Sequence, residues 1–138
     1  MRRFCMRPIL TTILAALVPL LVMAAADDEA QTAGEAWLSL LDSQKYEESW
    51  KQASSMFQSQ VTQEQWTAAL KKSRDPLGQL VSRSKSRADF LKTLRGAPDG
   101  DYAVFHFETG FQNREGVTER LTLVLEDGKW RAAAYAIH

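Results

Sequence analysis

The sequence predicts an α+β domain, with about three N-terminal helices packed on a curved antiparallel sheet of four to five strands. Three observations indicate this fold class. Apolar residues recur at helical spacing in the first half of the chain, up to Asp75. From Leu77 onward apolar and polar residues alternate as in strands. Turn signals separate the best strands, namely Gly96–Gly100 and the hairpin dipeptide Asp127-Gly128.

The first 26 residues have the organisation of a secretory signal peptide. Arg2 and Arg3 precede an apolar run from Ile9 to Met23, and small residues end at Ala26. A retained membrane anchor is the alternative, but this run is shorter than the about 20 apolar residues of a spanning helix. We therefore expect residues 1–26 to be cleaved near Ala26, leaving a periplasmic or secreted protein. Residues 27–138 then form a single domain without stable membrane insertion.

Composition excludes several function classes for that domain. The leader holds three of the arginines and no acid, so its removal makes a chain of zero net charge mildly acidic. An acidic domain is a poor partner for nucleic acid, whose binding depends on neutralising phosphates. The only cysteine, Cys5, lies in the leader. Disulfides, thiol catalysis and cysteine-based zinc sites are therefore excluded for the exported form.

The first half contains three apolar helix faces. The first begins at Trp37 and ends at Leu41, and the third is predicted to start with a capping box of Thr62 and Gln65 and to end before Pro76. The second face consists of residues spaced three or four apart, which predicts one continuous helix: Tyr46, Trp50, Ala53 and Phe57. The tryptophans could form an aromatic platform for sugars, but helical spacing favours a place in the core.

The second half contains five candidate strands: Leu77–Arg83, Ser86–Arg95, Tyr102–Thr109, Val117–Glu126 and Trp130–Ile137. In the third of these, Ala103, Phe105 and Phe107 share the apolar face. The apolar positions of the fourth strand are Val117, Leu121, Leu123 and Leu125. Arg83, Lys85 and Arg87 alternate with serines, so we expect them to line one side of a strand as a solvated edge, with binding of an anionic polymer as the alternative.

Four polar residues are our candidates for ligand binding. Tyr102, His106 and Glu108 share one side of a strand, and Arg120 is expected on the neighbouring strand. We place them in the concave mouth of the sheet, where they could hold or protonate a small ligand. The alternative is a solvent-facing sheet surface, which carries polar residues in any case.

No catalytic or metal-binding motif stands out. His106 and His138 are the only histidines, and their spacing matches no metal site. The chain has no G-x-S-x-G turn and no glycine-rich phosphate loop. We therefore predict no catalytic residues, no metal and no cofactor.

Several segments together resemble a known family of small exported bacterial proteins, catalogued as domain of unknown function 4019. They are Ala36–Leu38, Leu41-Asp42, Tyr46, Ser49-Trp50, Ala53-Ser54, Phe57, Gln65-Trp66, Arg74–Gly78, Gly96–Tyr102, Glu119, Thr122, Glu126–Arg131 and Tyr135. One departure is Ala134, where the family has glycine. The resemblance implies export and an α+β fold, but no agreed activity and no catalytic residues. A cystatin-like or nuclear-transport-factor-like cone is a fold-level analogy only.

We therefore expect a non-enzymatic exported domain that binds a small ligand or an envelope partner. One alternative is a small hydrolase or isomerase that uses His106 with Glu108 or Tyr102. Another is a structural envelope protein without a ligand. The residue pattern identifies no particular ligand or partner, and it leaves the oligomeric state open.

Overall fold

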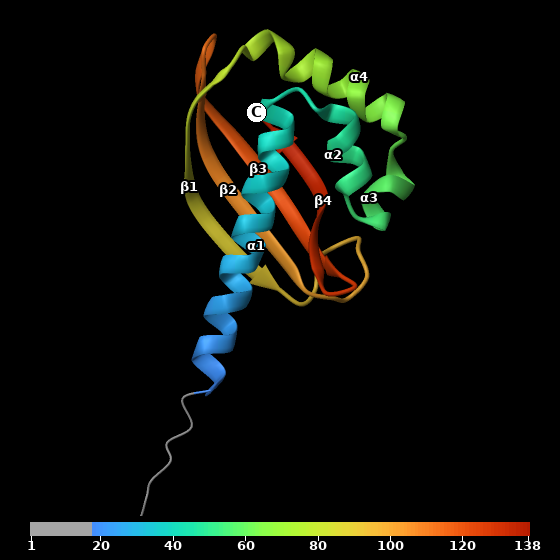
Figure 1. The fold of residues 1–138 in the computed structure, drawn as a ribbon, viewed down its shortest axis with the longest axis vertical. Helices are drawn as coiled ribbons and strands as arrows, with labels where there is room; N and C mark the ends of the chain where they lie inside the picture. The colour runs from blue at the N-terminus through green and yellow to red at the C-terminus, as the bar shows by residue number, and fades with distance from the viewer. Residues whose placement is uncertain (1–17) are drawn as a thin grey trace, which may run out of the picture.

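The fold is a four-stranded antiparallel sheet with helices packed on one face (Figure 1). The computed structural model describes residues 18–138, and side chains from residue 25 onward. Neighbouring strands follow the chain: β1 Leu80–Leu91, β2 Tyr102–Phe111, β3 Arg114–Glu126 and β4 Lys129–Ile137. The helices are α1 Val18–Asp42, α2 Tyr46–Gln52, α3 Ser55–Gln60 and α4 Gln63–Ser73, followed by the 3-10 turn η1 Asp75–Leu77. The predicted α+β class with an antiparallel sheet is confirmed.

The core lies between α1 and the sheet face that it covers, which we call the helix face. The alternation predicted for β2 is confirmed, because Ala103, Phe105 and Phe107 all belong to the core. From α1, α2, α3 and α4 the core receives Trp37, Leu38, Leu41, Tyr46, Phe57, Trp66 and Leu70. The tryptophans of α1 and α4 thus act in packing, with ring centroids 6.0 Å apart. The opposite sheet face, which carries no helix among residues 18–138, is the open face.

Helix α1 crosses the sheet closely at Gly34. A Cβ atom at this position would lie 3.3 Å from side-chain carbons of both Leu121 and Leu123. The N-terminal part of α1 runs past the end of the sheet (Figure 1). Most of the predicted leader, residues 1–17, lies outside the described residues, and the predicted cleavage point after Ala26 falls within α1. None of the described helices is long and apolar enough to cross a bilayer.

The predicted second helix is broken in two, which corrects the sequence interpretation. Its apolar spacing is helical, yet Ala53 and Ser54 are extended. The Ser54 backbone N–H donates to the Ala132 carbonyl of β4 at 2.8 Å. Its hydroxyl then caps α3 by accepting from the Phe57 N–H at 3.1 Å. This tertiary contact with the sheet outweighs the helical propensity of the segment.

The two strands predicted at the start of the sheet form the single strand β1. A register shift between Lys85 and Arg87 marks a bulge, and a second shift follows Leu80. Arg83 and Lys85 lie opposite Thr109 and Phe107 on the helix face, whereas Arg87 lies opposite His106 on the open face. The prediction that the three basic residues share one side is therefore wrong, because the bulge reverses the alternation.

Local signals with a defined hydrogen-bond or turn chemistry are confirmed. Thr62 and Gln65 form the reciprocal capping box at the start of α4. Asp127 and Gly128 both have positive φ, 51° and 76°, as the two-residue turn between β3 and β4 requires.

Candidate functional site

The four predicted ligand-binding residues lie on β2 and β3, on the open face. The register pairs His106 with Arg120 on one side and with Arg87 of β1 on the other. Glu108 and Arg120 are exposed, and His106 is half-buried. Because the helices pack on the opposite face, these side chains do not line a mouth between sheet and helices.

Tyr102 does not join the other three. Its ring is buried, and its hydroxyl donates to the Pro98 carbonyl at 2.5 Å. The phenol therefore anchors the loop between β1 and β2, and its proton is already engaged by the Pro98 carbonyl. The structure brings together His106, Glu108 and Arg120, on an exposed surface.

A cluster of four charged side chains, two of them buried and two half-buried, lies on the helix face instead. We call Asp42, Arg74, Arg83 and Glu119 the ion cluster. Both terminal nitrogens of Arg83 bind the Asp42 carboxylate, at 2.7 and 2.8 Å. Arg74 Nη2 binds the same carboxylate at 2.7 Å, and Arg83 Nε binds Glu119 at 2.8 Å. Two acids and two bases are thus neutralised together at the end of α1.

Glu119 is the most deeply buried member, with no exposed side-chain surface. Besides Arg83, its carboxylate accepts from the Thr109 hydroxyl at 2.7 Å and from the Tyr135 hydroxyl. A buried carboxylate is tolerated only when paired and hydrogen-bonded. Burial, and then the charge of Glu119, raise the pKa of Tyr135 well above its ordinary value. That phenol therefore stays a donor at any physiological pH.

Arg74 has hydrogen-bonding capacity that the cluster does not use. Its side chain is only 4% exposed and stacks on the Phe111 ring, with Cζ 5.0 Å from the centroid. Its Nη1 atom is buried, stands 3.8 Å from Glu119, and has no hydrogen-bond partner among the described residues. A buried donor of this kind is uncommon in folded proteins.

The ion cluster was missed by sequence reasoning. Glu119 occupies an inward position of β3 between Val117 and Leu121, so a charged residue within an apolar alternation was the available signal. Arg83 was predicted to be solvated; its side chain is instead 12% exposed and held by two carboxylates. No sequence pattern indicated that Asp42 and Arg74, from separate helices, would meet these two.

The pKa of Asp42 reflects its position in the cluster. Burial alone would raise it, but hydrogen bonds from Arg83 and Arg74, together with their charges, hold the pKa below its ordinary value. For Arg83, burial opposes the charge, yet the hydrogen bonds to Asp42 and Glu119 raise the pKa further. Both groups stay charged across the physiological range.

Next to the ion cluster lies a cavity of about 340 Å³, which we call the polar pocket. Its walls come from the end of α1, the start of α2, Arg74 and the segments before β1 and after β2. The lining residues are Leu41, Asp42, Ser43, Gln44, Tyr46, Arg74, Gly78, Gln79 and Gln112. Most of these carry hydroxyl, amide or charged groups, so the arrangement can exchange several hydrogen bonds with a bound molecule.

Gln44 shapes one wall of the polar pocket through its backbone. Its φ of 57° lies in the left-handed region, where glycine is usual. The N–H of Lys45 donates to the Leu40 carbonyl and that of Gln44 to the Leu41 carbonyl, at 2.8 and 3.1 Å. This pair of bonds is a Schellman motif, which ends α1 and turns the chain into α2.

Tyr46, in the wall of the polar pocket, is held in place by Asp75. The Tyr46 hydroxyl donates to Asp75 at 2.6 Å, which joins α2 to η1. Burial, and then this hydrogen bond to a carboxylate, raise the pKa of Tyr46 far above its ordinary value. The tyrosine therefore serves as a fixed donor rather than as an acid–base group.

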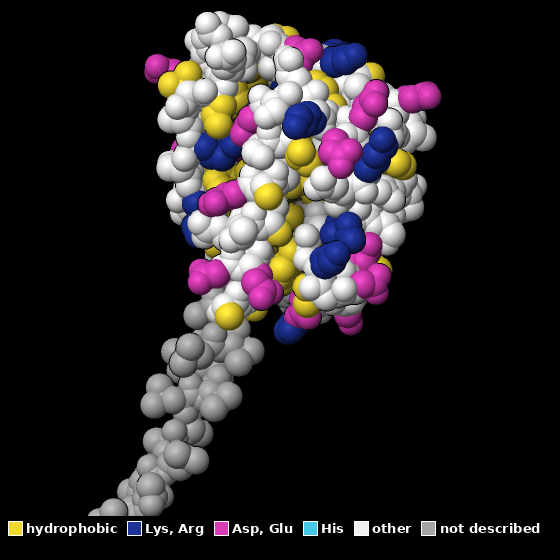
Figure 2. All heavy atoms as spheres, viewed as in Figure 1, with side chains coloured by type: hydrophobic (Ala, Val, Ile, Leu, Met, Phe, Trp, Pro, Cys, Tyr) yellow, Lys and Arg dark blue, Asp and Glu magenta, His cyan; other side chains and the backbone are white. Residues whose placement is uncertain are grey.

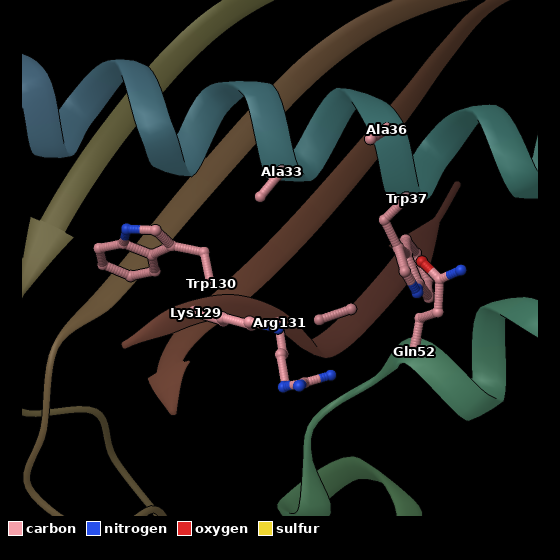
Figure 3. A pocket seen from close by; sticks show the side chains of 8 residues that line it. Ala33, Ala36, Trp37, Gln52, Lys129, Trp130 and Arg131 are labelled. Atoms are coloured by element: carbon pink, nitrogen blue, oxygen red, sulfur yellow. The ribbon is translucent and has the colours of Figure 1, made fainter. Parts of the chain in front are cut away.

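A second cavity, of about 310 Å³, lies between α1 and β4 (Figure 3). Ala33 and Ala36 of α1 form its roof, with Trp37 and Gln52 at one end and Trp130 at the other. The Trp130 N–H is buried and has no hydrogen-bond partner among the described residues. The walls of this second cavity are mostly aliphatic and aromatic, so it offers fewer polar groups than the polar pocket.

Residues 33–135, three quarters of the chain, match the family described as protein of unknown function (DUF4019). The chain belongs to the DUF4019 family. The predicted resemblance is therefore confirmed, and the matched region contains the whole ion cluster and the whole polar pocket of this DUF4019 protein. Comparison with curated proteins found no match.

Proposed function

We propose that this protein is an exported, non-enzymatic binding domain that holds a small neutral or zwitterionic molecule in the polar pocket. The observation that carries the proposal is Arg74. This buried side chain lines the cavity and keeps one N–H group without a partner within residues 18–138. Nη1 itself is shielded from solvent, so a ligand oxygen reaches it once the Arg74 side chain turns toward the cavity, and the bond then satisfies a donor whose lack of a partner destabilises the fold by roughly 1–3 kcal/mol.

The rest of the pocket wall supports a hydrogen-bonding ligand. Ser43, Gln79 and Gln112 contribute an exposed hydroxyl and two exposed amides to the lining. Each amide can both donate and accept, and the hydroxyl does the same. The cavity volume is at the low end of the range for small-molecule sites, roughly 300–1,000 Å³. A ligand of the size of a sugar or an amino acid suits both the volume and the polarity.

The local charges support a molecule without net charge. Asp42 and Arg74 line the pocket together and neutralise one another, with Arg83 and Glu119 balanced behind them. On the side seen in Figure 2, Lys and Arg side chains alternate with Asp and Glu over the helices, without a patch of one sign. Neither feature favours a strongly anionic or cationic ligand.

The open-face residues support catalysis less well. His106 lies opposite Arg120 on a surface where Glu108 is exposed, so water has access to all three. General acid–base catalysis depends on a substrate held within hydrogen-bond reach of the histidine. The polar pocket is a hollow that combines buried Arg74 and Tyr46 with exposed amide and hydroxyl groups, and we therefore place ligand binding there.

Ligand binding is tested by thermal unfolding of the full-length protein in the presence of neutral sugars and free amino acids. A ligand that binds only the folded state stabilises it by RT ln(1 + L/Kd), where L is the ligand concentration, so the midpoint rises with the logarithm of that concentration once it exceeds Kd. In Gln112→Ala, the ligand concentration that gives the same midpoint shift should rise about tenfold, as expected for loss of about 1.4 kcal/mol of hydrogen bonding. Gln52→Ala, at the other cavity, is the matched control and should leave the shift unchanged. The proposal fails if no probe raises the midpoint, or if both variants behave like the wild type.

Export is tested by fractionating cells and sequencing the N-terminus of the protein. We expect a periplasmic or secreted chain that begins at Asp27. An uncleaved chain in the cytoplasm would contradict this part of the proposal and leave the binding test in force.

A further inference from the structure

Strand β1 forms an edge of the sheet, with no strand paired to its outer side among residues 18–138. It is paired with β2 on one side, and nearly all of its 12 residues are exposed. Five large apolar side chains are exposed among the described residues, and four of them lie at the two ends of β1: Leu80, Val81, Phe90 and Leu91. Long apolar edges invite pairing with another strand.

The other edge of the sheet is already engaged within the chain. The Ala132 carbonyl of β4 accepts a hydrogen bond from the Ser54 N–H at the corner between α2 and α3. A partner strand would therefore add at β1. If that partner is a second copy, the two β1 edges satisfy each other and the assembly closes as a dimer.

We propose that β1 pairs with β1 of a second copy of this chain, antiparallel, about a two-fold axis between Lys85 and Ser86. This register places Val81 opposite Phe90 of the second copy at each end of the edge, so both side chains gain an apolar neighbour. The outermost pair, Leu80 and Leu91, points to opposite faces, because the shift that follows Leu80 puts it opposite Phe111 of the helix face, whereas Leu91 lies opposite Tyr102 of the open face. Cross-strand pairs of this kind stabilise antiparallel sheets.

Charge selects the same register. It places Lys85 opposite Ser86, Arg87 opposite Ser84, and Arg83 opposite Ala88. A shift by one residue in one direction puts Lys85 opposite its own copy, and in the other direction it puts Lys85 opposite Arg87. Like charges directly opposite each other are destabilising. Both neighbouring registers are therefore disfavoured.

The bulge of β1 provides a third, independent reason. Residues opposite each other in a sheet point to the same face, so in a regular strand a two-fold pairs positions of equal parity. The proposed register pairs an even with an odd number. The bulge between Lys85 and Arg87 makes this possible, because Ser82, Ser84, Arg87 and Asp89 all lie on the open face opposite β2 residues of that face. Thus Ser84 meets Arg87, and Ser82 meets Asp89, on one side of a continuous sheet.

Cysteine cross-linking of the full-length chain in a Cys5→Ser background tests the register. Under mild oxidation, Ser82→Cys with Asp89→Cys should give a covalent dimer, because these positions face each other only across the two-fold. Within one chain they are about 23 Å apart at 3.3 Å per residue, beyond the reach of a disulfide. Each single variant should stay uncrosslinked for the same reason. A cross-linked single variant, or an uncrosslinked double variant, overturns the register.

Sedimentation of the full-length protein tests the dimer itself. Val81→Lys, at a side chain 71% exposed, should weaken self-association about tenfold through lost apolar contact. Leu125→Lys, at the exposed apolar residue outside β1, is the matched control and should leave it unchanged. A wild-type chain that sediments as a monomer at all concentrations, or equal weakening by both variants, contradicts the proposal.

Discussion

At the scale of single residues, Glu119 shows how this fold tolerates charge in its interior. In place of water, the carboxylate has an ion pair with Arg83 and hydrogen bonds from the Thr109 and Tyr135 hydroxyls. Removing one partner of such a group leaves the others buried and unpaired, which destabilises more than the pair itself stabilises. The buried positions of β3 are therefore not interchangeable with exposed positions on the same sheet.

We predict that Glu119→Gln lowers the free energy of unfolding by roughly 3 kcal/mol, because Arg74 and Arg83 then share one carboxylate. Urea unfolding followed by tryptophan fluorescence measures the change. Glu108→Gln, on the exposed side of the neighbouring strand, is the control and should stay within about 0.5 kcal/mol of the wild type. Equal effects of the two substitutions would show that the ion cluster has no structural role.

Gln44 gives a second prediction at this scale. Its left-handed backbone at the end of α1 is about 1 kcal/mol less favourable for glutamine than for glycine. Gln44→Gly should therefore stabilise the protein by about 0.5–1 kcal/mol, measured by denaturant unfolding. Ser43→Gly, one residue earlier, serves as the control and should not stabilise. Loss of stability in Gln44→Gly would mean that the glutamine side chain contributes more than its backbone strain removes.

At the scale of elements, the approach of α1 to the sheet depends on one glycine. Gly34 brings the helix backbone against Leu121 and Leu123, and any Cβ there would be tightly packed. A larger side chain would lift α1 from the helix face and loosen the corner where it meets α2. The position of the polar pocket therefore depends on this contact.

We predict that Gly34→Leu destabilises the protein by about 1–3 kcal/mol through overpacking, despite the higher helix propensity of leucine. Thr32→Leu, at an exposed position of the same helix, should change stability by less than about 0.5 kcal/mol. Thermal unfolding monitored by circular dichroism distinguishes the two. A stable Gly34→Leu variant would show that the helix and sheet can separate without penalty.

At the scale of the whole molecule, the ion cluster connects the end of α1, the segment after α4, and strands β1 and β3. Tyr135 adds β4, and Tyr46 with Asp75 ties α2 to η1. Elements far apart in sequence are thus held by groups that titrate at the two ends of the pH range. Stability against pH should reflect this.

We predict a broad stability plateau that falls at both ends. The pKa of Asp42 is lowered by folding, so its contribution is present above the ordinary aspartate range and is lost as the pH falls below about 4. The pKa values of Tyr46 and Tyr135 are raised, so their contribution is present below about pH 10 and decreases above it by about 1.4 kcal/mol per pH unit for each tyrosine. Urea unfolding across pH measures both limbs. Tyr46→Phe should halve the slope of the alkaline limb, because Tyr135 still contributes, and an unchanged slope would refute this origin.

Much of this fold could be predicted because its signals are local. The capping box at Thr62, the hairpin turn at Asp127-Gly128 and the alternation along β2 each depend on residues within a few positions of one another. The break at Ser54 and the bulge in β1 could not be predicted, since both are set by hydrogen bonds to strands distant in sequence. The residues of the candidate site were the hardest part to predict for this reason. His106 and Arg120 could be expected to pair, but the ion cluster required four elements to meet.

By itself the sequence determined the fold class, the order of helices and strands, the family and the absence of thiols from the domain after residue 26. These follow from periodicity, turn chemistry and composition, which act over short stretches of chain. Only the tertiary structure decided which polar groups are buried together. Burial of Glu119, the spare N–H of Arg74 and the exposed edge of β1 all depend on how distant segments pack, and it is burial, not residue type, that makes a polar group costly to leave unpaired.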